Sequence, residues 1–267
     1  MLSVCKARLS FDAGTPEART VLDGIDLHLS EAEFLTIIGS NGAGKSTLFN
    51  AIAGGVFLDE GEITLDGEDI TRKKEHYRAR SIGRLFQDPH TGTAAGLTIE
   101  ENLALVYSRA TNRFPLARAL HREDRAFFRE VLSRLDMGLE NRLKTLVGAL
   151  SGGQRQALTL LTATLVPPKL LLLDEHTAAL DPVSARKVLD LTRDITRTHR
   201  ITSLMITHNI SSALDMGSRT IMMHRGRIVM DIKSPERENL SVEGLLKRYK
   251  EAVGGALDTD RILFEGA

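Results

Sequence analysis

The chain has 267 residues, and Lys plus Arg and Asp plus Glu each number 35, so the formal net charge is zero. This balance excludes a global basic field that would hold the protein on nucleic acid. The single cysteine, Cys5, excludes a disulfide framework and a thiolate zinc site within the chain, which suits the reducing cytoplasm. No apolar run approaches the roughly 18 residues that span a bilayer, so we expect any membrane association to be peripheral.

The first 55 residues predict strands that lead into one helix. "LDGIDLHL" alternates apolar and polar residues with the period of a strand, and "EFLTIIG" is an apolar strand that a glycine ends. From "GKSTLFNAIAG" onward the spacing becomes helical, at Leu48 and Ile52, until Gly54 and Gly55. This order of strand, turn and helix is the context that a phosphate-binding loop requires.

The middle of the chain predicts a hairpin-like segment over 61–70 and a mostly helical insert over 98–147. Thr98 and Glu101 have the spacing of a capping box where the insert begins. "FFREVLSRL" then places apolar residues at helical spacing.

The C-terminal third predicts apolar strands separated by a helix. We interpret "KLLLLDE", "ITSLMITH" and "TIMMHRGRIVM" each as a strand, and Asp181 with Pro182 marks the helix start. Strands that alternate with helices indicate a parallel sheet covered on both faces, an α/β fold. The tail over 240–250 predicts a helix that docks on the core through Val242, Leu245, Leu246 and Tyr249.

Residues 39–46, "GSNGAGKS", match the eight-position phosphate-loop pattern, with glycine at both fixed places followed by lysine and serine. Backbone amides in such a loop face phosphate oxygens, and the next helix adds its dipole. We expect Lys45 to bridge the terminal phosphates and Ser46 to ligate magnesium. The alternative, a chance match in a glycine-containing turn, is disfavoured by the flanking strand and helix. The predicted nucleotide-binding residues here are Gly39, Ser40, Asn41, Gly42, Ala43, Gly44, Lys45, Ser46 and Thr47.

Two adjacent acids, Asp174 and Glu175, follow the apolar run "LLLL". A nucleoside triphosphate with magnesium needs an acid at the end of a neighbouring buried strand, which is the position of Asp174. Glu175 could then orient or deprotonate the attacking water. The alternative is that both acids only mark the end of a strand.

The segment 150–157, "LSGGQRQA", predicts a second anion site at the start of a helix. Ser151 and Gln154 have capping-box spacing, and Gly152 and Gly153 leave backbone amides uncovered. This site has no lysine of its own. A complete phosphate loop and a lysine-free anion site in one chain suggest that the second site serves the nucleotide of another chain.

Six motifs in a fixed order carry a family resemblance: "GSNGAGKST", "LFQDP", "LSGGQRQ", "LLLLDE", "AALD" and "MITHN". The chain resembles the ATP-binding cassette (ABC) family from residue 4 to about 230. The resemblance implies a P-loop NTPase with a RecA-like core, an antiparallel N-terminal β subdomain and a helical insert. It implies one domain over 1–250, with the core and β subdomain in 1–87 and 148–230, the helical subdomain in 88–147, and a tail over 231–267.

The resemblance also implies roles for single residues. Gln87 would sense magnesium and the attacking water, and His208 would contact the terminal phosphate. With Gln154, the residues Ser151, Gly152 and Gly153 would clamp the ATP of the opposite subunit in a head-to-tail dimer, and Asp181 would communicate across that dimer. Phe11 would stack on the adenine; a core phenylalanine is the alternative. The implied sets are catalytic Glu175, His208, Gln87 and Lys45, and magnesium ligands Ser46, Gln87 and Asp174.

Two positions depart from the family pattern. His176 stands where most members have proline, and Ala178 where serine is usual. Magnesium prefers oxygen ligands, and a proline can neither bind metal nor relay protons, so we interpret His176 as a structural residue beside the chemistry. "DEHTAALDP", "FQDPHTGTAAGLTIEENLAL" and "LSVEGLLKRYKEAVG" resemble a bacterial subfamily described as tryptophan or tyrosine import systems.

The resemblance therefore implies an importer ATPase with ATP and Mg2+ as cofactors. Its implied partners are an integral-membrane permease, a second copy of the chain and, indirectly, an extracytoplasmic solute-binding protein, at the cytoplasmic face of the membrane and without nucleic acid. A soluble cassette ATPase of DNA repair or translation, an exporter ATPase and a non-hydrolysing regulator are the alternatives. The single cassette and neutral charge disfavour the soluble ATPase, and Glu175 with His208 disfavours the regulator.

Overall fold

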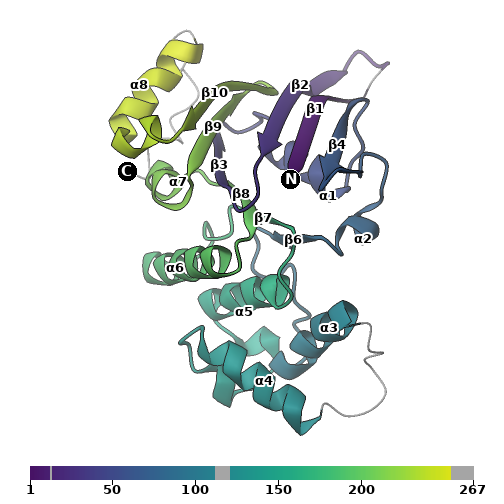
Figure 1. Cartoon of the computed structure of the whole chain (residues 1–267), viewed down its shortest axis with the longest axis vertical. Coiled ribbons are helices and arrows are strands. Elements are labelled where there is room, and N and C mark those ends of the chain that lie inside the picture. Colours follow the sequence, from purple (N-terminus) through teal and green to yellow (C-terminus); the bar gives the residue numbers. More distant parts are fainter. Residues whose placement is uncertain (13, 112–120, 254–267) are drawn as a thin grey trace.

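The computed structural model describes residues 1–12, 14–111 and 121–253 of the chain. Two β-sheets occupy the upper half of the molecule in Figure 1, and helices flank and extend below them. The antiparallel sheet has the order β2-β1-β4-β5, with β1 Leu2–Phe11, β2 Arg19–Leu29, β4 Glu60–Leu65 and β5 Glu68–Asp69. The larger sheet has the order β10-β9-β3-β8-β7-β6, with β3 Phe34–Gly39, β6 Ile82–Leu85, β7 Leu170–Asp174, β8 Thr202–Ile206, β9 Arg219–His224 and β10 Arg227–Lys233.

The helices fall between these strands along the chain. Those near the sheets are α1 Lys45–Ala53, α2 Glu75–Arg78, α6 Pro182–Thr198, α7 Ile210–Met216 and α8 Val242–Val253. The lower helices in Figure 1 are α3 Ile99–Thr111, α4 Arg122–Ser133 and α5 Gly152–Thr164, with short 3-10 turns at Leu139–Asn141 and Val147–Ala149; a third turn is Glu236–Asn239. The predicted P-loop NTPase fold with an antiparallel sheet and a helical insert is confirmed.

Strand β7 is buried on both of its faces. Leu170 and Leu172 belong to the cluster that contains α1, whereas Leu171 and Leu173 pack with residues of α5 and α6 on the other face. All four leucines are 0% exposed. A central parallel strand covered on both sides needs such an uninterrupted apolar run, which explains the sequence "LLLL".

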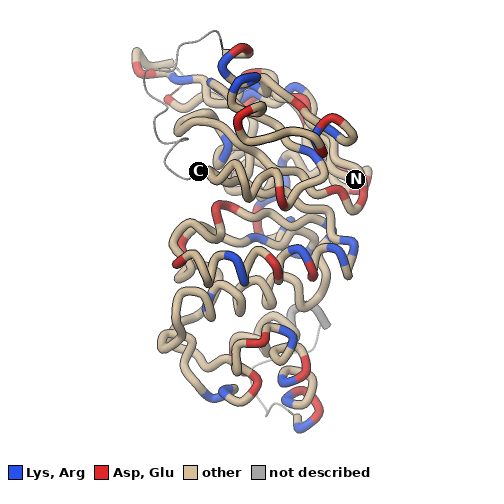
Figure 2. Tube along the Cα trace, turned by 90° about the vertical axis from the view of Figure 1, so that its left-hand side faces the viewer, with Lys and Arg blue, Asp and Glu red and all other residues tan. Residues whose placement is uncertain are grey.

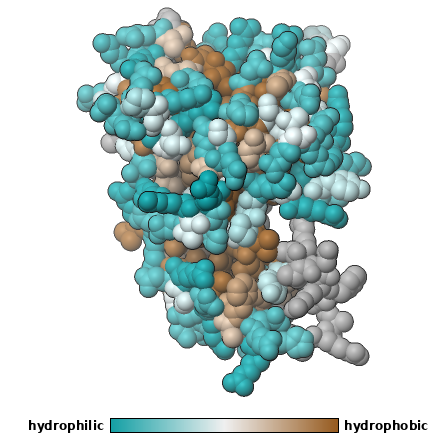
Figure 3. Space-filling view, viewed as in Figure 1, coloured by the Kyte–Doolittle hydropathy of each residue, from teal (hydrophilic) through white to brown (hydrophobic). Residues whose placement is uncertain are grey.

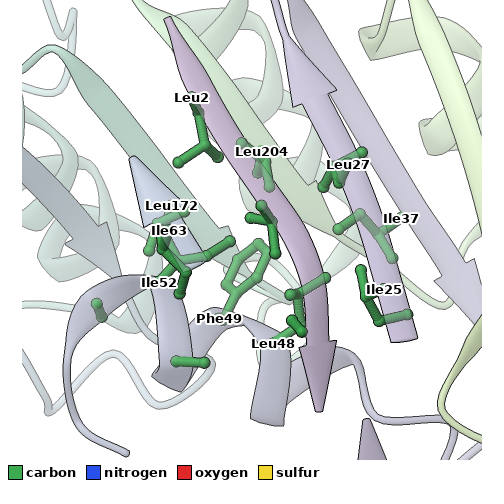
Figure 4. Packing of buried hydrophobic residues seen from close by; sticks show 14 of the residues in the cluster. Leu2, Ile25, Leu27, Ile37, Leu48, Phe49, Ile52, Ile63, Leu172 and Leu204 are labelled. Carbon is green, nitrogen blue, oxygen red and sulfur yellow. The ribbon is translucent and has the colours of Figure 1, made fainter. Parts of the chain in front are cut away.

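The largest hydrophobic cluster joins the two sheets through helix α1. Phe49 is surrounded by apolar side chains from both sheets, among them Leu2 and Ile63 of the antiparallel sheet and Leu172 and Leu204 of the other (Figure 4). Burial of a phenylalanine side chain stabilises the fold by about 2 kcal/mol or more. The phosphate-loop helix is therefore fixed from two sides.

The segment "TIMMHRGRIVM" is two strands, so its interpretation as a single strand was wrong. His224 pairs with Arg227 across a two-residue turn, and β10 runs antiparallel to β9 at the edge of the sheet. Both turn residues, Arg225 and Gly226, have positive φ angles of 45° and 77°. A two-residue hairpin with a type I′ turn needs positive φ at both central residues, and Arg-Gly is a weaker signal for it than Asn-Gly.

The lower helices share a hydrophobic cluster of their own. It includes Ile99 and Leu103 of α3, Phe128 of α4 and Leu158 of α5. The predicted capping box at the start of α3 is confirmed, since Thr98 N–H donates to Glu101 Oε2 at 2.7 Å and Glu101 N–H donates to Thr98 Oγ1 at 3.3 Å. The predicted boundaries of the subdomains stay predictions.

Helix α8 docks on the edge of the larger sheet, as the tail pattern predicts. Leu245 and Tyr249 are 0% and 1% exposed and pack with Met222 and Ile232 from β9 and β10. Figure 1 shows α8 beside β10. Strand β10 extends to Lys233, beyond the predicted start of the tail at 231.

The described surface is mixed in charge. Figure 2 shows lysine and arginine interspersed with acidic residues over both halves of the molecule. In Figure 3 hydrophilic residues cover most of the face shown, and hydrophobic ones gather in the middle of its upper part and in its lower part. Within the described ranges, no helix has the length and apolar character needed to cross a membrane.

The packing of α8 predicts a stability effect. Leu245→Ala should lower the free energy of unfolding by about 3 kcal/mol, because it leaves a cavity under the helix. The matched control Lys247→Ala, at an exposed position of the same helix, should change it by less than about 0.5 kcal/mol. Urea unfolding of both variants measures the difference, and equal values would contradict the docking.

Candidate active site

The phosphate loop lies between β3 and α1 and is closely backed by other strands. A Cβ at Gly39 would lie 2.2 Å from the Met223 carbonyl oxygen of β9. At Gly44, where φ is +99°, a Cβ would lie 2.6 Å from the Val21 carbonyl oxygen of β2. No side chain fits either position, so the two fixed glycines of the motif are required by packing as well as by backbone conformation.

The loop presents donors for an anion. Gly44, the N-cap of α1, makes no side-chain capping hydrogen bond, which leaves the first amides of the helix for a ligand. Lys45 is 5% exposed, and its Nζ donates to the Gly39 carbonyl at 2.5 Å and to the Ser40 carbonyl at 3.0 Å. The Lys45 ammonium and the uncapped amides of α1 together supply the positive charge and the N–H donors that a chain of phosphates needs. Of the other predicted residues, Ala43 is buried, Thr47 is half-buried, and Asn41, Gly42 and Ser46 are exposed.

Glu175 and His208 meet at the carboxyl edge of the larger sheet. His208 Nε2 lies 2.6 Å from Glu175 Oε1, and the side chains are 30% and 12% exposed. Glu175 follows β7 with φ +45°, and its N–H donates to the Ile206 carbonyl of β8 at 3.0 Å. The neighbouring strand thus fixes the backbone of Glu175, and the imidazole fixes its carboxylate. Sequence reasoning predicted both residues, and the structure brings them together.

The residues predicted to hold magnesium supply oxygen donors, the type that this ion prefers. Asp174 ends β7, and burial raises the pKa of its carboxyl group, which the nearby Arg84 opposes. Gln87 follows β6, which pairs with β7 in parallel (Leu85 with Leu173), so Gln87 is exposed at the same edge. Within the described ranges, no three His, Cys, Asp or Glu side chains form a metal cluster. The donor set fits Mg2+, which is bound through few protein ligands together with phosphates and water.

Sequence reasoning missed Arg84, which lies in this site. Its Nη2 is 3.6 Å from Asp174 Oδ2 and donates to Asn50 Oδ1 of α1 at 2.8 Å. The signal for it was a charged residue inside the otherwise apolar segment "IGRLF". A cation in a buried strand needs a partner, and Asp174 is the acid at the end of the next strand.

Phe11 is an exposed aromatic residue near the phosphate loop. It ends β1, is 44% exposed and pairs in register with Arg19 of β2. A Cβ at Gly42 would lie 3.2 Å from Arg19 Nη2, so the neighbour of Phe11 reaches the loop. Exposure removes the alternative of a core phenylalanine. Arg19 was missed, because only the register of the hairpin places it here.

The second predicted anion site begins helix α5. Ser151 Oγ accepts from Gln154 N–H at 3.3 Å and Gln154 Oε1 accepts from Ser151 N–H at 3.3 Å, which confirms the capping box. In Figure 1 α5 lies among the lower helices and α1 in the upper half. Gly152 is exposed, whereas a Cβ at Gly153 would lie 2.7 Å from Ser184 Cβ of α6. Gly153 therefore serves helix packing within the chain.

Asp181 is the N-cap of α6. Its Oδ1 accepts from Ser184 N–H at 3.0 Å and from Val183 N–H at 3.1 Å. The pKa of Asp181 is lowered, mainly because Ser184 donates hydrogen bonds to its carboxylate. Since Ser184 also faces Gly153, the "AALD" segment and the start of α5 share one packing contact. The predicted role across a dimer stays a prediction.

His176 is buried beside helix α6 and is 2% exposed. The hydroxyl of Thr192 donates to the Val188 carbonyl at 2.8 Å, so at 3.2 Å it accepts from His176 Nε2–H. Burial lowers the pKa of His176 from 6.5 to about 4. The imidazole is therefore neutral near pH 7 and points into the core, which agrees with a structural role.

This burial predicts a pH dependence of stability. Between pH 6.5 and about 4 the unfolded chain takes up a proton at His176 that the folded chain does not. The contribution of His176 to the free energy of unfolding should therefore fall as the pH drops through that window, by about 3 kcal/mol in total. His176→Gln keeps a donor for Thr192 and removes the titration, so urea unfolding at pH 7.0 and 4.5 should show a smaller loss of unfolding free energy than in the wild type.

At pH 7.5 the ATPase rate of His176→Gln should stay within about tenfold of the wild type. An equal pH loss, or a thousandfold slower rate in a folded variant, would contradict the structural role.

A family model described as ABC transporter matches residues 22–178. Over 253 residues the chain is 42% identical to the "Tyrosine transport ATP-binding protein" of Clostridioides difficile, an alignment that covers 95% of this chain and 100% of that protein. It is 39% identical over 212 residues to the "Methionine import ATP-binding protein MetN" of Rhizobium johnstonii, covering 78% of this chain and 55% of that protein.

A solved structure with the same fold is a dimeric ATP-binding cassette in a post-hydrolysis state, bound to ADP and Pi. The TM-score is 0.72 at 26% identity, and the match covers 87% of this chain and 98% of that one.

Proposed function

This chain belongs to the ABC transporter family and is one of its ATPases, and we propose that it powers the uptake of a solute, with an aromatic amino acid as the solute class, through a separate membrane permease. The observation that carries the ATP-hydrolysing part of the proposal is the carboxyl edge of the larger sheet, where the Glu175–His208 pair lies at 2.6 Å beside the strand that leads into the phosphate loop. The similarity to a protein named for tyrosine transport supports the solute class.

In this proposal each residue of the site has a step in hydrolysis. Loop residues 39–47 and the N-terminus of α1 bind the phosphates of ATP, and Lys45 balances charge on the terminal phosphoryl group. Glu175 accepts a proton from the attacking water, whose oxygen bonds to the terminal phosphorus as the bridging P–O bond breaks and ADP leaves. His208, whose Nε2 lies 2.6 Å from Glu175 Oε1, holds the carboxylate toward the water and contacts the terminal phosphate.

Asp174, Ser46 and Gln87 would hold the magnesium ion, which supplies charge neutralisation for the phosphates. Asp174 is fixed by its place at the end of β7, and Ser46 by the first turn of α1. Gln87 lies on the segment that leads from β6 to the helical insert. A conformational change of that insert can therefore move Gln87 relative to the two other ligands.

The second anion site acts in trans in this proposal. Ser151, Gly152, Gly153 and Gln154 begin a helix without a lysine, so they complete the ATP site of a second copy arranged head to tail. The dimeric state of the similar cassette supports this arrangement. Phe11 would stack on the adenine in this proposal, and its 44% exposure and the approach of its hairpin partner Arg19 to the phosphate loop support that role.

The membrane partners follow from the same proposal. The chain would lie at the cytoplasmic face of the membrane, held there by an integral-membrane permease. An extracytoplasmic solute-binding protein would deliver the solute, and nucleic acid has no part in the cycle. Co-purification from membranes tests this assignment, because the permease should accompany the chain.

Glu175→Gln tests the base directly. The variant should bind ATP as well as the wild type, hydrolyse it at least about 100-fold more slowly and accumulate as a closed dimer. Turnover and molecular mass in saturating ATP and magnesium are measured together. Full turnover, or a monomer under these conditions, would rule out the assigned role.

Sharing of sites predicts rescue in mixed dimers. Lys45→Ala and Gly152→Asp chains should each be inactive alone, whereas their mixture contains a site free of both lesions and should regain activity, up to roughly half that of the wild type when mixed dimers dominate. Gly152 is the better position than Gly153, where any side chain would meet Ser184 in the same chain. If mixed dimers form, as tagged copies can show, and remain inactive, the sites are not shared.

A further inference from the structure

Arg84 is a half-buried cation that no step of the proposed mechanism uses. It lies on β6 with its side chain 15% exposed, beside the 14% exposed Asp174 of β7. Residue 84 pairs in register with Leu172, so the guanidinium reaches along the sheet toward the carboxyl end of β7. A charge in this position needs compensation, because transfer of an arginine from water into a protein interior is costly.

The tightest contacts of Arg84 are not with Asp174. Its Nη2 donates to Asn50 Oδ1 at 2.8 Å, and its guanidinium carbon lies 4.6 Å from the centre of the Phe86 ring. The distance to Asp174 Oδ2 is longer, at 3.6 Å. The side chain is therefore anchored by two uncharged groups, on α1 and at Phe86, and Asp174 is the acid within ion-pair distance of its charge.

A magnesium ion at Asp174 would share this carboxylate with a second cation. Two positive charges a few ångströms apart repel each other, and the effect is large where water is partly excluded. We propose that Arg84 is a positioning residue that competes with magnesium for Asp174 and so weakens the affinity of the ATP site for the ion. This inference rests on the proposed role of Asp174 as a magnesium ligand.

Arg84 lies where several parts of the site meet. Asn50 lies on the phosphate-loop helix, and the carbonyl of Phe86, next to Gln87, accepts from Gln156 Nε2 of α5 at 3.4 Å. Arg84 thus touches α1, the end of β7 and the residue before Gln87. Weaker magnesium binding at this junction would favour release of the ion with ADP.

The test compares the affinity of the full chain for a non-hydrolysable ATP analogue in excess Mg2+ and in EDTA by calorimetry. The dissociation constant in EDTA divided by that in Mg2+ is a ratio that reports the coupling between ion and nucleotide. Arg84→Gln, which keeps a donor for Asn50, should raise this ratio by about tenfold, because one repulsive charge is removed. Arg84→Lys, the matched control, keeps the charge and should leave the ratio within about threefold of the wild type.

Two further variants separate the possible failures. Arg84→Met fills the space against Phe86 and must also raise the ratio, which covers the case in which Arg84→Gln does not fold. Asp174→Asn should bring the ratio toward one; a ratio as in the wild type would refute Asp174 as the ligand and with it the proposed site. If Asp174→Asn behaves as expected but loss of the Arg84 charge leaves the ratio unchanged or lowers it, or if Arg84→Lys raises it equally, the competition is refuted and the proposed function is not.

Discussion

Burial of the central parallel strands on both faces is the constraint on which the rest of the structure depends. The interior of β7, Leu170–Leu173, holds only apolar side chains, so the polar group of this strand, Asp174, comes where the strand ends. The strands β3, β8, β7 and β6 run in one direction, so their carboxyl ends share an edge. That edge collects Gly39, His208, Asp174 and Gln87, each from a different strand end.

The phosphate loop depends on the rest of the fold for its shape. The Gly226 amide of the β9–β10 turn donates to the Ala43 carbonyl at 3.0 Å, and a Cβ at Gly226 would lie 2.6 Å from the Val21 carbonyl oxygen. The loop is thus clamped between β2 of the antiparallel sheet and the hairpin at the other sheet. This packing explains why the small antiparallel sheet matters to a site built on the parallel one.

Local sequence signals predicted the parts of the fold and site that are decided locally. The apolar run before Asp174, the glycines around Lys45 and the capping residue Ser151 each act through neighbours in the chain, and the structure contains all three features. They also predicted the arrangement of the site in outline, because parallel strands bring their carboxyl ends together. The roles of the individual residues remain proposals.

Features that depend on contacts between distant segments were beyond these signals. A local feature was also missed: the β9–β10 turn uses Arg225 in place of the usual turn residues, so one apolar run hid two strands. Arg84 and Arg19 become site neighbours only through strand register, and Gly153 is needed because of Ser184 on another helix. The burial of His176 against Thr192 likewise depends on how α6 packs.

The central claim is that the phosphates of ATP bind at Lys45, on the edge that carries the acids. Calorimetric titration of ATP into the wild type, Lys45→Ala and the exposed control Lys144→Ala tests it most directly. Loss of the charge-assisted contacts should weaken binding by at least about thirtyfold in Lys45→Ala and leave Lys144→Ala unchanged. Unchanged affinity in a folded Lys45→Ala chain would contradict the claim.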